Sequence, residues 1–565
     1  MRLTAVHIEK FRGLGSVRLE LPPTTLLIGE NNSGKSSVLD AIRLALSRAA
    51  GRKTGTFEPY DYYLGTPTAE PQSADPISVT LTFTADAGEV LQDEFTQMLG
   101  DALVTDNAGR PFLIFRVTSA FDRALNDFVA EWQFMDVAGN ALGPKSRRPS
   151  ILQDFQRLFP VFYLSALRDA VREFRTGSFW TSFIKNPAIP ADLKQQLQEQ
   201  INQLNRAVLD AHGSLRTVKD HLAKVRDLVP LGGTNTVDID ALPGRLSDLL
   251  TSTQVNISGI TGASIPLARH GAGTQSLSVL FLFQAYLTAM LQQQYSALST
   301  PILALEEPEA HLHPFATRSL WSTLEAIPGQ KIIASHSGDL LANAPLSSIR
   351  RLYAANGATQ IGSIPNGLLT ADEERKVQFH ITASRGELLF ARCWLLFEGE
   401  SEHWMLEGLA RAKTRDVDRW GVRMIAYRVS GHECLLKVAN ALGIPWFLLA
   451  DGDDQGKKTV AGGTKYLNAA NAIDRILQIP EASIELHLCA NGFGAVFESH
   501  ISAQKKQLVT ATKGSLQYWE QVLKAKDDTP KPTVIQEVVQ HIEQGVTPPP
   551  RLLDVLDRTL RLAGA

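Results

Sequence analysis

Residues 29–36 read GENNSGKS, and this stretch decides the fold of the first half of the chain. It fits the pattern GxxxxGK[ST], in which backbone N–H groups wrap around phosphates and the glycines permit that wrapping. The apolar run 24–28 before it predicts a buried parallel strand. The apolar residues spaced through 38–46 after it predict a helix. Strand, glycine loop and helix therefore follow in the order that a phosphate-binding loop requires.

This loop predicts a site for a nucleotide, which we take to be ATP. Lys35 would reach the β- and γ-phosphates, and Ser36 would coordinate Mg²⁺. An ordinary glycine turn is the alternative, and the strand before the loop and the helix after it argue against that alternative. The loop residues that we assign to nucleotide binding are Gly29, Asn31, Asn32, Ser33, Gly34, Lys35, Ser36 and Ser37.

A second element of such a site is an acidic strand end. Residues 302–307 read ILALEE, an apolar strand that ends in two carboxylates. Burying unpaired carboxylates is expensive, so their presence indicates a function. Glu306 would support the metal ion, and Glu307 would orient the attacking water.

The stretch 269–276, RHGAGTQS, opens an apolar helix that we expect at about 277–291. A glycine turn that leads into a helix N-terminus presents free N–H groups to an anion. Taken alone this signal is weak. About 30 residues later comes the acidic strand end, and this order is typical of ABC-type ATPases, in which a signature loop of one subunit closes on the nucleotide held by the other.

Five motifs together resemble the ATPase of RecF-like and OLD-family (overcoming lysogenization defect) proteins, over about 1–165 and 250–365. The resemblance implies signature-loop roles for Gly273, Gln275 and Ser276, acidic roles for Glu306 and Glu307, and a γ-phosphate-sensing role for His336. A Glu at 306 departs from the commoner Asp. His311 and His313 are interpreted as part of a turn that contacts the opposite subunit rather than as zinc ligands, because no nearby carboxylate or Cys completes a zinc set. The motifs are FRG, GENNSGKSS, GAGTQS, LALEEPEAHLHP and IIASHS.

A second acidic group lies in the C-terminal part. Residues 398–402, EGESE, follow the apolar run WLLF, and residues 451–453, DGD, follow the apolar run WFLLA. Carboxylates that follow parallel strands gather at one edge of the sheet, where open α/β folds bind ligands. Hard oxygen ligands suit Mg²⁺ or Mn²⁺, and two such ions would stabilise the attacking and the leaving oxygen of a phosphodiester. The alternative is a solvated charged loop.

This acidic pattern resembles a Toprim domain, which has EGxxE after one strand and DxD after a later one. The resemblance implies that Glu398, Glu402, Asp451 and Asp453 are the catalytic metal-binding acids. The implied additional residues are Glu498 in VFESH, as a further metal ligand, and Lys531 in DTPKP, which would steady the scissile phosphate. Among the tyrosines of the C-terminal half none has a recognisable nucleophile setting, so a metal-activated water is the expected nucleophile.

Length and composition set the frame. A chain of 565 residues with a net charge of −3 predicts two to four domains and argues against a uniformly basic nucleic-acid coat. Three dispersed cysteines predict buried thiols in a reducing compartment. With no signal-peptide pattern and no long apolar run, we expect a cytoplasmic protein without a membrane partner.

The expected fold class is α/β: an ABC-type ATPase with mixed sheets and a helical insertion, followed by a Toprim (Rossmann-like) domain. Alternating runs within 78–135 predict an antiparallel sheet. Apolar spacing within 191–228 predicts a helical hairpin or a broken helix, with a dimer contact and a layer packed on its own domain as equal alternatives. C-terminal strands are expected at 394–397, 424–429, 446–450 and 484–488, with an amphipathic helix after Pro550. The expected domains are 1–165 and 251–370 for the ATPase, 166–250 for the insertion and 385–565 for the Toprim nuclease.

The order of ATPase first and Toprim second resembles OLD-family nucleases throughout. It implies an ATP-binding and hydrolysing, Mg²⁺- or Mn²⁺-dependent DNA endonuclease or nickase that acts in phage defence or DNA processing. It also implies a homodimer or higher homo-oligomer, and in one branch of the family a UvrD-like helicase partner. Two alternatives stay open: a DNA-binding ATPase scaffold whose acidic site is inert, and a topoisomerase- or primase-like enzyme.

Overall fold

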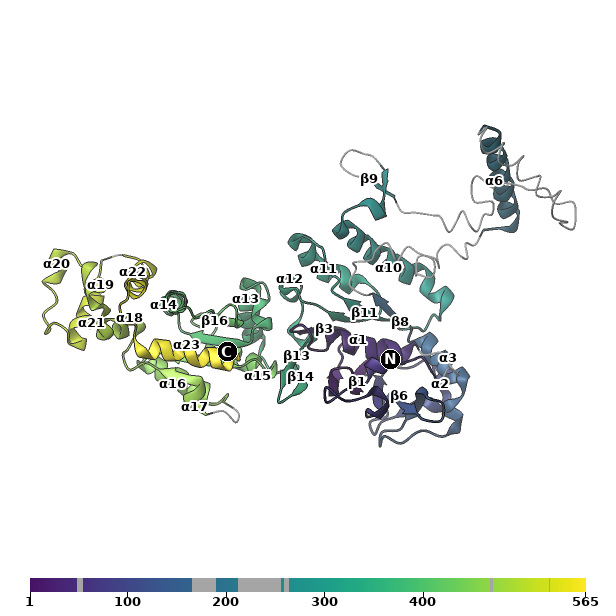
Figure 1. Ribbon diagram of the computed structural model, residues 1–565, viewed down its shortest axis with the longest axis horizontal. Coiled ribbons are helices and arrows are strands. Elements are labelled where there is room, and N and C mark those ends of the chain that lie inside the picture. Colours follow the sequence, from purple (N-terminus) through teal and green to yellow (C-terminus); the bar gives the residue numbers. More distant parts are fainter. Residues whose placement is uncertain (48–53, 165–188, 212–255, 259–263, 468–470, 528) are drawn as a thin grey trace, which may run out of the picture.

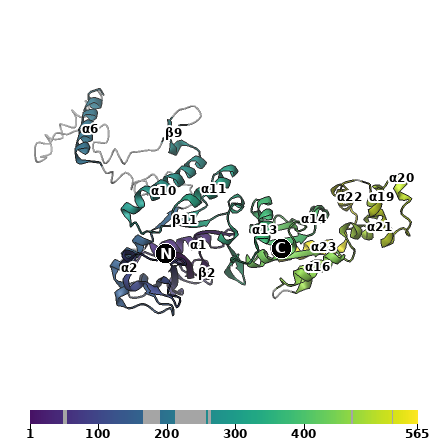
Figure 2. The same cartoon turned by 180° about the vertical axis from the view of Figure 1, so that it is seen from behind.

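The computed structural model describes residues 1–47, 54–164, 189–211, 256–258, 264–467, 471–527 and 529–565. These residues form two α/β parts arranged along the long axis of the molecule (Figures 1 and 2). The N-terminal part, purple to teal, contains two sheets of six strands, and the C-terminal part, green to yellow, contains one sheet of four strands. The predicted fold class is confirmed by these sheets.

The central sheet of the N-terminal part carries the predicted phosphate-binding loop, residues 29–37. All its strands are parallel except β14, which pairs antiparallel with β13. Because β3, β12 and β11 are parallel neighbours, the residues that follow them lie at one edge of the sheet. In spatial order the strands are β14 (Ala358–Ser363), β13 (Ile349–Ala355), β3 (Thr24–Gly29), β12 (Gln330–Ala334), β11 (Ile302–Glu306) and β8 (Val161–Leu164).

The second N-terminal sheet is antiparallel, as the alternating runs predict. Its apolar face packs on Phe155, whose ring lies 4.9 Å from that of Phe115 and 5.3 Å from that of Phe83. The strands are β1 (Arg2–Phe11), β2 (Leu14–Glu20), β4 (Ile77–Thr84), β5 (Val104–Thr105), β6 (Pro111–Asp122) and β7 (Asp127–Met135). The helices here are α1 (Lys35–Leu46), α2 (Asp93–Leu99) and α3 (Pro149–Leu158).

The remaining N-terminal elements include the predicted helices. The first arm of the predicted hairpin is α6, with Leu193 and Leu204 exposed by 43% and 55%. The second arm, at 215–228, and most of the insertion 166–250 lie outside the described residues, so self-association stays a prediction. These elements are α6 (Ala191–Ala211), β9 (Asn256–Ser258), β10 (Ser264–Pro266), α10 (Ala272–Gln294), α11 (Pro314–Ala326) and α12 (Gly338–Leu341). Among the described residues, no helix is both long and apolar enough to cross a membrane.

The C-terminal sheet is parallel throughout, in the order β16-β15-β17-β18. Cys393, Cys434 and Cys489 of this part are buried free thiols. The strands are β15 (Cys393–Phe397), β16 (Val422–Ala426), β17 (Trp446–Ala450) and β18 (Ile476–Gln478). The helices are α13 (Ala371–Ala383), α14 (Glu400–Ala412), α15 (His432–Ala441), α16 (Asp454–Thr464), α17 (Ala472–Arg475), α18 (Ile484–Leu488), α19 (Gly494–Ser499), α20 (Ala503–Lys506), α21 (Leu516–Ala525), α22 (Lys531–Glu543) and α23 (Pro550–Leu562).

One predicted strand is wrong. Residues 484–488 form helix α18, and the strand beside β17 is β18, a few residues earlier. The Ser483 hydroxyl accepts a hydrogen bond from the N–H of Leu486 at 3.3 Å, and this cap starts the helix. A run of five mostly apolar residues does not distinguish a buried strand from a short buried helix, so the cap decided the outcome.

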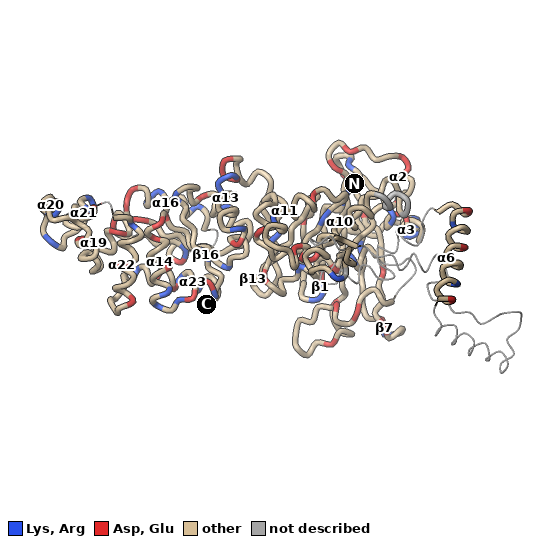
Figure 3. The backbone as a smooth tube through the Cα atoms, turned by 90° about the horizontal axis from the view of Figure 1, so that it is seen from above, with Lys and Arg blue, Asp and Glu red and all other residues tan. Residues whose placement is uncertain are grey.

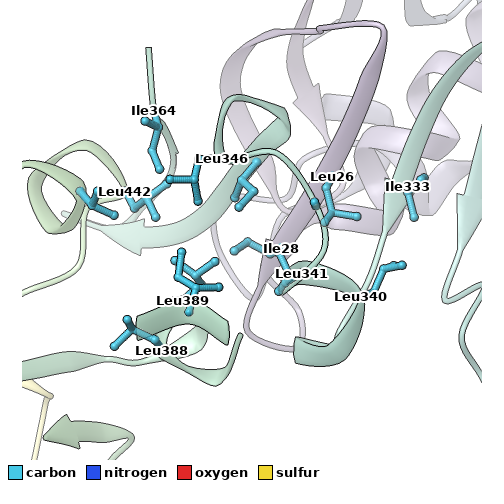
Figure 4. Close-up of a cluster of buried hydrophobic side chains, with 14 of the residues drawn as sticks. Leu26, Ile28, Ile333, Leu340, Leu341, Leu346, Ile364, Leu388, Leu389 and Leu442 are labelled. Carbon is cyan, nitrogen blue, oxygen red and sulfur yellow. The ribbon is translucent and has the colours of Figure 1, made fainter. Parts of the chain in front are cut away.

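The two parts share one hydrophobic core. Figure 4 shows Ile28 of β3 near Leu389 of the C-terminal part, and one cluster of buried residues contains both together with Leu26, Leu388 and Leu442. Leu26 and Ile28 belong to the strand that leads into the phosphate-binding loop. The C-terminal part therefore packs directly against β3, the strand that precedes the loop.

Arg351 of β13 stabilises this junction through buried hydrogen bonds. Its guanidinium donates to the carbonyl oxygens of Leu442 at 3.2 Å, Gly443 at 3.1 Å and Ala391 at 3.0 Å. The side chain is buried, and burial lowers its pKa. Three carbonyl groups of one part thus depend on a single side chain of the other.

We predict that Arg351→Ala loosens the junction, because buried carbonyl oxygens lose their donors at a cost of about 2–4 kcal/mol. Limited proteolysis under native conditions should then release the C-terminal part by cleavage between residues 364 and 392. The matched control is Arg350→Ala, since Arg350 is also buried but donates only to Glu20, Ser347 and Ile349 of the N-terminal part. Equal fragment release from both variants would contradict this prediction.

Candidate functional site

The backbone of the phosphate-binding loop adopts a conformation that requires glycine. Gly34 has a φ of +99°, and a Cβ atom there would lie 2.5 Å from the Leu14 side chain. Helix α1 begins directly after it, at Lys35, and no side chain caps the helix start. The first N–H groups of α1 therefore remain free to receive an anion.

Lys35 is folded back onto its own loop. Its ammonium group donates to the carbonyl oxygens of Gly29 and Glu30, each at 2.9 Å. Burial lowers the pKa of Lys35 to about 8, against a smaller opposing effect of Glu307. A partly desolvated cation that is held by carbonyl and hydroxyl dipoles and has no carboxylate hydrogen-bond partner is well suited to a polyanion.

The acids at the end of β11 and the histidine after β12, His336, lie near Lys35. The pKa of His336 is lowered by burial and then by the charge of Lys35, while Glu307 opposes that shift, so the three groups lie within electrostatic reach of one another. Glu306 has one carboxylate oxygen, Oε1, that is buried without a hydrogen-bond partner among the described residues. An orphaned carboxylate oxygen of this kind fits a cation or a water bound to one.

Glu309 is a residue that the sequence reasoning missed. Its carboxylate accepts hydrogen bonds from the Ser335 hydroxyl at 2.6 Å and from the N–H of His336 at 3.1 Å. Burial raises the pKa of Glu309. This side chain thus ties the turn after β11 to the histidine after β12. The motif EEPE contains it, but nothing in the local pattern distinguishes its role from that of a surface acid.

The signature stretch packs on the turn that contains the two histidines. A Cβ atom on Gly273 would lie 2.8 Å from the carbonyl oxygen of His311. The Gln275 amide donates to the carbonyl of His270 at 2.7 Å, and Ser276 is fully buried. His313 accepts the N–H of Phe315 at 3.3 Å and caps α11, which fits the turn interpretation of this histidine pair.

A cavity of about 870 Å³ in the C-terminal part collects the second acidic group. Glu398 follows β15 and Asp451 follows β17, and these two strands are parallel neighbours. Their carboxylates therefore reach the same edge of the sheet, as the sequence predicts. The structure brings together in this cavity the predicted residues Glu398, Glu402, Asp451, Asp453 and Lys531.

A glycine turn keeps the second acidic motif in place. A Cβ atom on Gly452 would lie 2.5 Å from the carbonyl oxygen of Glu481, and one on Gly456 would lie 1.8 Å from that of Asp451. The Gln478 amide donates to the carbonyl of Asp451 at 2.9 Å. The chain after β17 is therefore packed closely against the chain after β18. This contact fixes the backbone position of Asp451.

Asp451 lies at the electrostatic centre of the cavity. Its pKa is raised to about 8, first by burial and then by the charges of Glu402, Glu398, Glu485 and Asp453. The pKa of Glu402 is also raised, by burial first and then by Glu485 and Glu398. Clustered acids of this kind are costly unless a proton or a cation compensates them, so they indicate a functional site.

Glu485 of α18 is the second residue that sequence reasoning missed. It is buried and lines the cavity, and it accepts the Ser401 hydroxyl and pairs with the Lys531 ammonium, each at 2.8 Å. The pKa of Glu485 is lowered by Lys531 and Ser401, which outweigh its burial. An acid soon after β18 was the available signal, and the wrong strand at 484–488 concealed it.

Glu498 is not brought to this cavity. It lies on α19, in the helical lobe at the end of the molecule distant from the N-terminal part (Figure 1). Its carboxylate accepts the Tyr518 hydroxyl at 2.8 Å and pairs with Lys513 at 3.1 Å. Its predicted place beside the other acids is therefore corrected: Glu485, and not Glu498, lines the cavity with them.

The donor atoms of the cavity suit a hard divalent cation in kind. Carboxylates supply oxygen ligands, which Mg²⁺ and Mn²⁺ prefer. In the described residues, however, no three acids, histidines or cysteines are already grouped at metal-binding spacing. Protein donors hold two of the acids, since Glu402 accepts the N–H of Gly399 at 3.1 Å and Asp453 accepts that of Gly456 at 2.6 Å.

Comparisons with known proteins agree with this architecture. The family described as Protein of unknown function (DUF2813) matches residues 1–387, and the one described as Overcoming lysogenization defect protein-like, TOPRIM domain, matches residues 389–453. Uncharacterized protein YbjD of Escherichia coli (strain K12) is 29% identical over 576 residues, covering 100% of this chain and 99% of that protein. Old nuclease of Escherichia phage P2 is 24% identical over 477 residues, covering 80% of this chain and 77% of that protein.

Among solved structures, a Smc head domain with an extended coiled coil, derived from Pyrococcus furiosus, is similar at 14% identity and a TM-score of 0.38. That similarity covers 67% of this chain and 99% of the other.

The strand orders and the two sites define a class of protein: an α/β part with a GxxxxGK[ST] loop joined to a C-terminal Toprim domain. The first family matches residues 1–387, well over half of the chain. The chain therefore belongs to the DUF2813 family, and its C-terminal part carries an OLD-like Toprim domain. The resemblance to OLD-family proteins that the motifs indicated is thereby confirmed.

We predict that Glu485→Gln weakens Mn²⁺ binding to the full-length protein roughly tenfold, the effect typical of removing a group that supports a metal site. Glu498→Gln should leave the affinity unchanged, because its carboxylate is paired elsewhere. Isothermal titration with Mn²⁺ measures both variants. A larger loss from Glu498→Gln than from Glu485→Gln would restore the sequence-based assignment.

Proposed function

We propose that this protein is an ATP-binding and ATP-hydrolysing, divalent-metal-dependent DNA endonuclease or nickase. The observation that carries the proposal is the convergence of Glu398, Glu402, Asp451 and Asp453 in one cavity with a lysine at its wall. The similarity to Old nuclease of phage P2 supports the choice of DNA as the substrate. We also propose a role in phage defence or DNA processing, which the resemblance of the motifs to OLD-family nucleases implies.

The proposed chemistry is hydrolysis of a phosphodiester. One or two Mg²⁺ or Mn²⁺ ions, when bound, would activate the attacking water and stabilise charge on the leaving oxygen. Glu398, Glu402, Asp451 and Asp453 would hold these ions, with Glu485 beside them. Lys531 lines the cavity wall, has a side chain that is 64% exposed and pairs with Glu485, and it would contact the scissile phosphate.

DNA would be held by local contacts rather than by a basic face. Figure 3 shows lysines and arginines interspersed with acids along both parts of the molecule. At the cavity itself, Arg423 and Arg428 join Lys531 in the lining. Such groups contact backbone phosphates without reading the sequence. We propose a cleavage site that opens on a modest basic rim.

In the ATPase-like part, ATP and Mg²⁺ would occupy the loop 29–37. Lys35 would leave its two carbonyl partners for the phosphates, and Ser36 and Glu306 would support the ion. Glu307 would orient the attacking water, and His336 would contact the γ-phosphate. Gly273, Gln275 and Ser276 would serve the nucleotide of a second copy in a homodimer or higher oligomer. A UvrD-like helicase is a further proposed partner.

A second candidate is a DNA-binding ATPase scaffold whose acidic cavity is inert. The observation in its favour is that, in the described residues, the acids are not yet grouped at metal-binding spacing. The two candidates differ in one measurable property, which is cleavage of a DNA backbone. A topoisomerase-like activity would instead relax supercoiled DNA without leaving nicks.

We predict that the purified protein nicks or linearises supercoiled plasmid in the presence of Mg²⁺ or Mn²⁺ and that EDTA abolishes this activity. Asp451→Ala should lower the rate at least about a hundredfold, because the central acid of the cavity is lost. Gel electrophoresis of the plasmid forms is the measurement, and Glu498→Gln is the control. An unchanged plasmid with the wild-type protein would favour the scaffold.

We also predict that Lys35→Ala abolishes ATP hydrolysis, because no other ammonium group lies in the loop to neutralise the phosphates. Phosphate release measures this directly. The same variant, assayed for plasmid cleavage with and without ATP, shows whether the nucleotide drives cleavage or restrains it. Retention of full ATPase activity would remove the loop 29–37 from the proposed mechanism.

A further inference from the structure

A second cavity, of about 640 Å³, lies where the phosphate-binding loop meets the C-terminal part. The N-terminal side contributes loop residues and the histidine that follows β12. The C-terminal side contributes three arginines. The residues that matter to the argument are Gly29, Glu30, Asn31 and His336 on one side and Arg392, Arg419 and Arg423 on the other.

One ion pair crosses this cavity. The Arg392 guanidinium donates to the two carboxylate oxygens of Glu30, from Nε at 2.6 Å and from Nη2 at 2.9 Å. The two residues are 362 positions apart in the chain. Glu30 is the second residue of the phosphate-binding loop, so a side chain of the Toprim part holds that loop directly. Paired parallel contacts of this kind fix orientation as well as charge.

The position of Arg392 is itself well determined. Its N–H donates to the carbonyl of Gly421 at 2.9 Å, and the residue directly precedes β15. The same strand ends beside Glu398 of the acidic cavity. Arg423 lines both cavities and pairs with Asp418 and Glu387. Arg392 and Arg423 on the C-terminal side of this second cavity thus belong to the same sheet as the acidic cavity, or to the segment that leads into it.

Glu30 is also held by Lys35, the lysine that must move when a nucleotide arrives. Lys35 contacts the carbonyl oxygen of Glu30, while Arg392 contacts its carboxylate. Without Arg392, the carboxylate would stand as an uncompensated negative charge beside the triphosphate, and like charges at short range repel. Arg392 removes that repulsion and keeps the loop mouth in one orientation.

We propose that Arg392 of the Toprim part is a positioning residue for the nucleotide, acting within the same chain by neutralising and orienting Glu30. The proposal rests on the nucleotide site described under the proposed function. It makes nucleotide affinity depend on a residue of the nuclease part. By linkage, occupancy of the loop then acts back on the segment that leads into β15.

The test measures binding of a fluorescent ATP analogue, with Mg²⁺, to the full-length protein and three variants. Arg392→Ala should raise Kd roughly fivefold, the size expected for a well-formed exposed charge pair. The KM for ATP should rise with it while kcat stays the same, because Arg392 acts on binding and does not touch the reacting atoms.

The decisive variant is Glu30→Gln combined with Arg392→Ala. Because the repelling charge is gone, its affinity should return close to that of the wild type. The matched control is Arg415→Ala, which removes a comparably exposed pair, Arg415 with Asp557 at 2.8 Å, within the C-terminal part alone. This control should leave Kd unchanged.

Three results would overturn the proposal. An unchanged Kd in Arg392→Ala shows that the ion pair has no effect on the nucleotide. An equal loss in Arg392→Ala and in the double variant shows that Arg392 acts through general structure rather than through the charge of Glu30. Absence of nucleotide binding by the wild type removes the nucleotide site itself, and that failure is distinct from the other two.

Discussion

Mutual repulsion among carboxylates at one edge of a parallel sheet is the constraint on which the C-terminal part depends. Strands β15 and β17 are neighbours, so the acids after each strand meet whether or not their charges favour it. Burial intensifies the repulsion, and Asp451 responds with a pKa raised to about 8. A fold that holds such a cluster has a strongly negative potential in one cavity, and this potential attracts cations.

The surrounding residues moderate this repulsion without removing it. Gly399 and Gly456 donate backbone N–H groups to Glu402 and Asp453, and Lys531 supplies a cation to Glu485. These donors occupy individual acids and leave Asp451 at the centre of the cluster. The cavity is therefore stable as a protein surface and still electrostatically incomplete, which is the state expected of a site that gains its cations from solution.

The junction between the two parts follows a different logic. A shared apolar core and the three carbonyl contacts of Arg351 join β3 and β13 to the C-terminal part. The phosphate-binding loop emerges from this junction and is held across it by Arg392. Close-packed interiors resist gradual deformation. A change in the loop is therefore transmitted over a short path to the four-stranded C-terminal sheet.

Much of this architecture could be predicted locally. The structure confirms the strands predicted from continuous apolar runs before Gly29, Glu398 and Asp451, and the helix predicted from apolar spacing after Lys35. Residues 484–488 have three apolar residues among five and form a helix, because the cap at Ser483 outweighs this short apolar pattern. Local pattern therefore identified long or strongly bounded elements and was least reliable for a short run.

The sequence by itself determined that a phosphate-binding loop and two acidic strand ends exist, because glycine spacing, strand alternation and adjacent carboxylates are properties of contiguous residues. Tertiary structure alone decided that Glu485 rather than Glu498 joins the acids and that Arg392 grips Glu30. Those choices depend on helices and loops packing across hundreds of residues, and no local periodicity encodes which side chains then face each other.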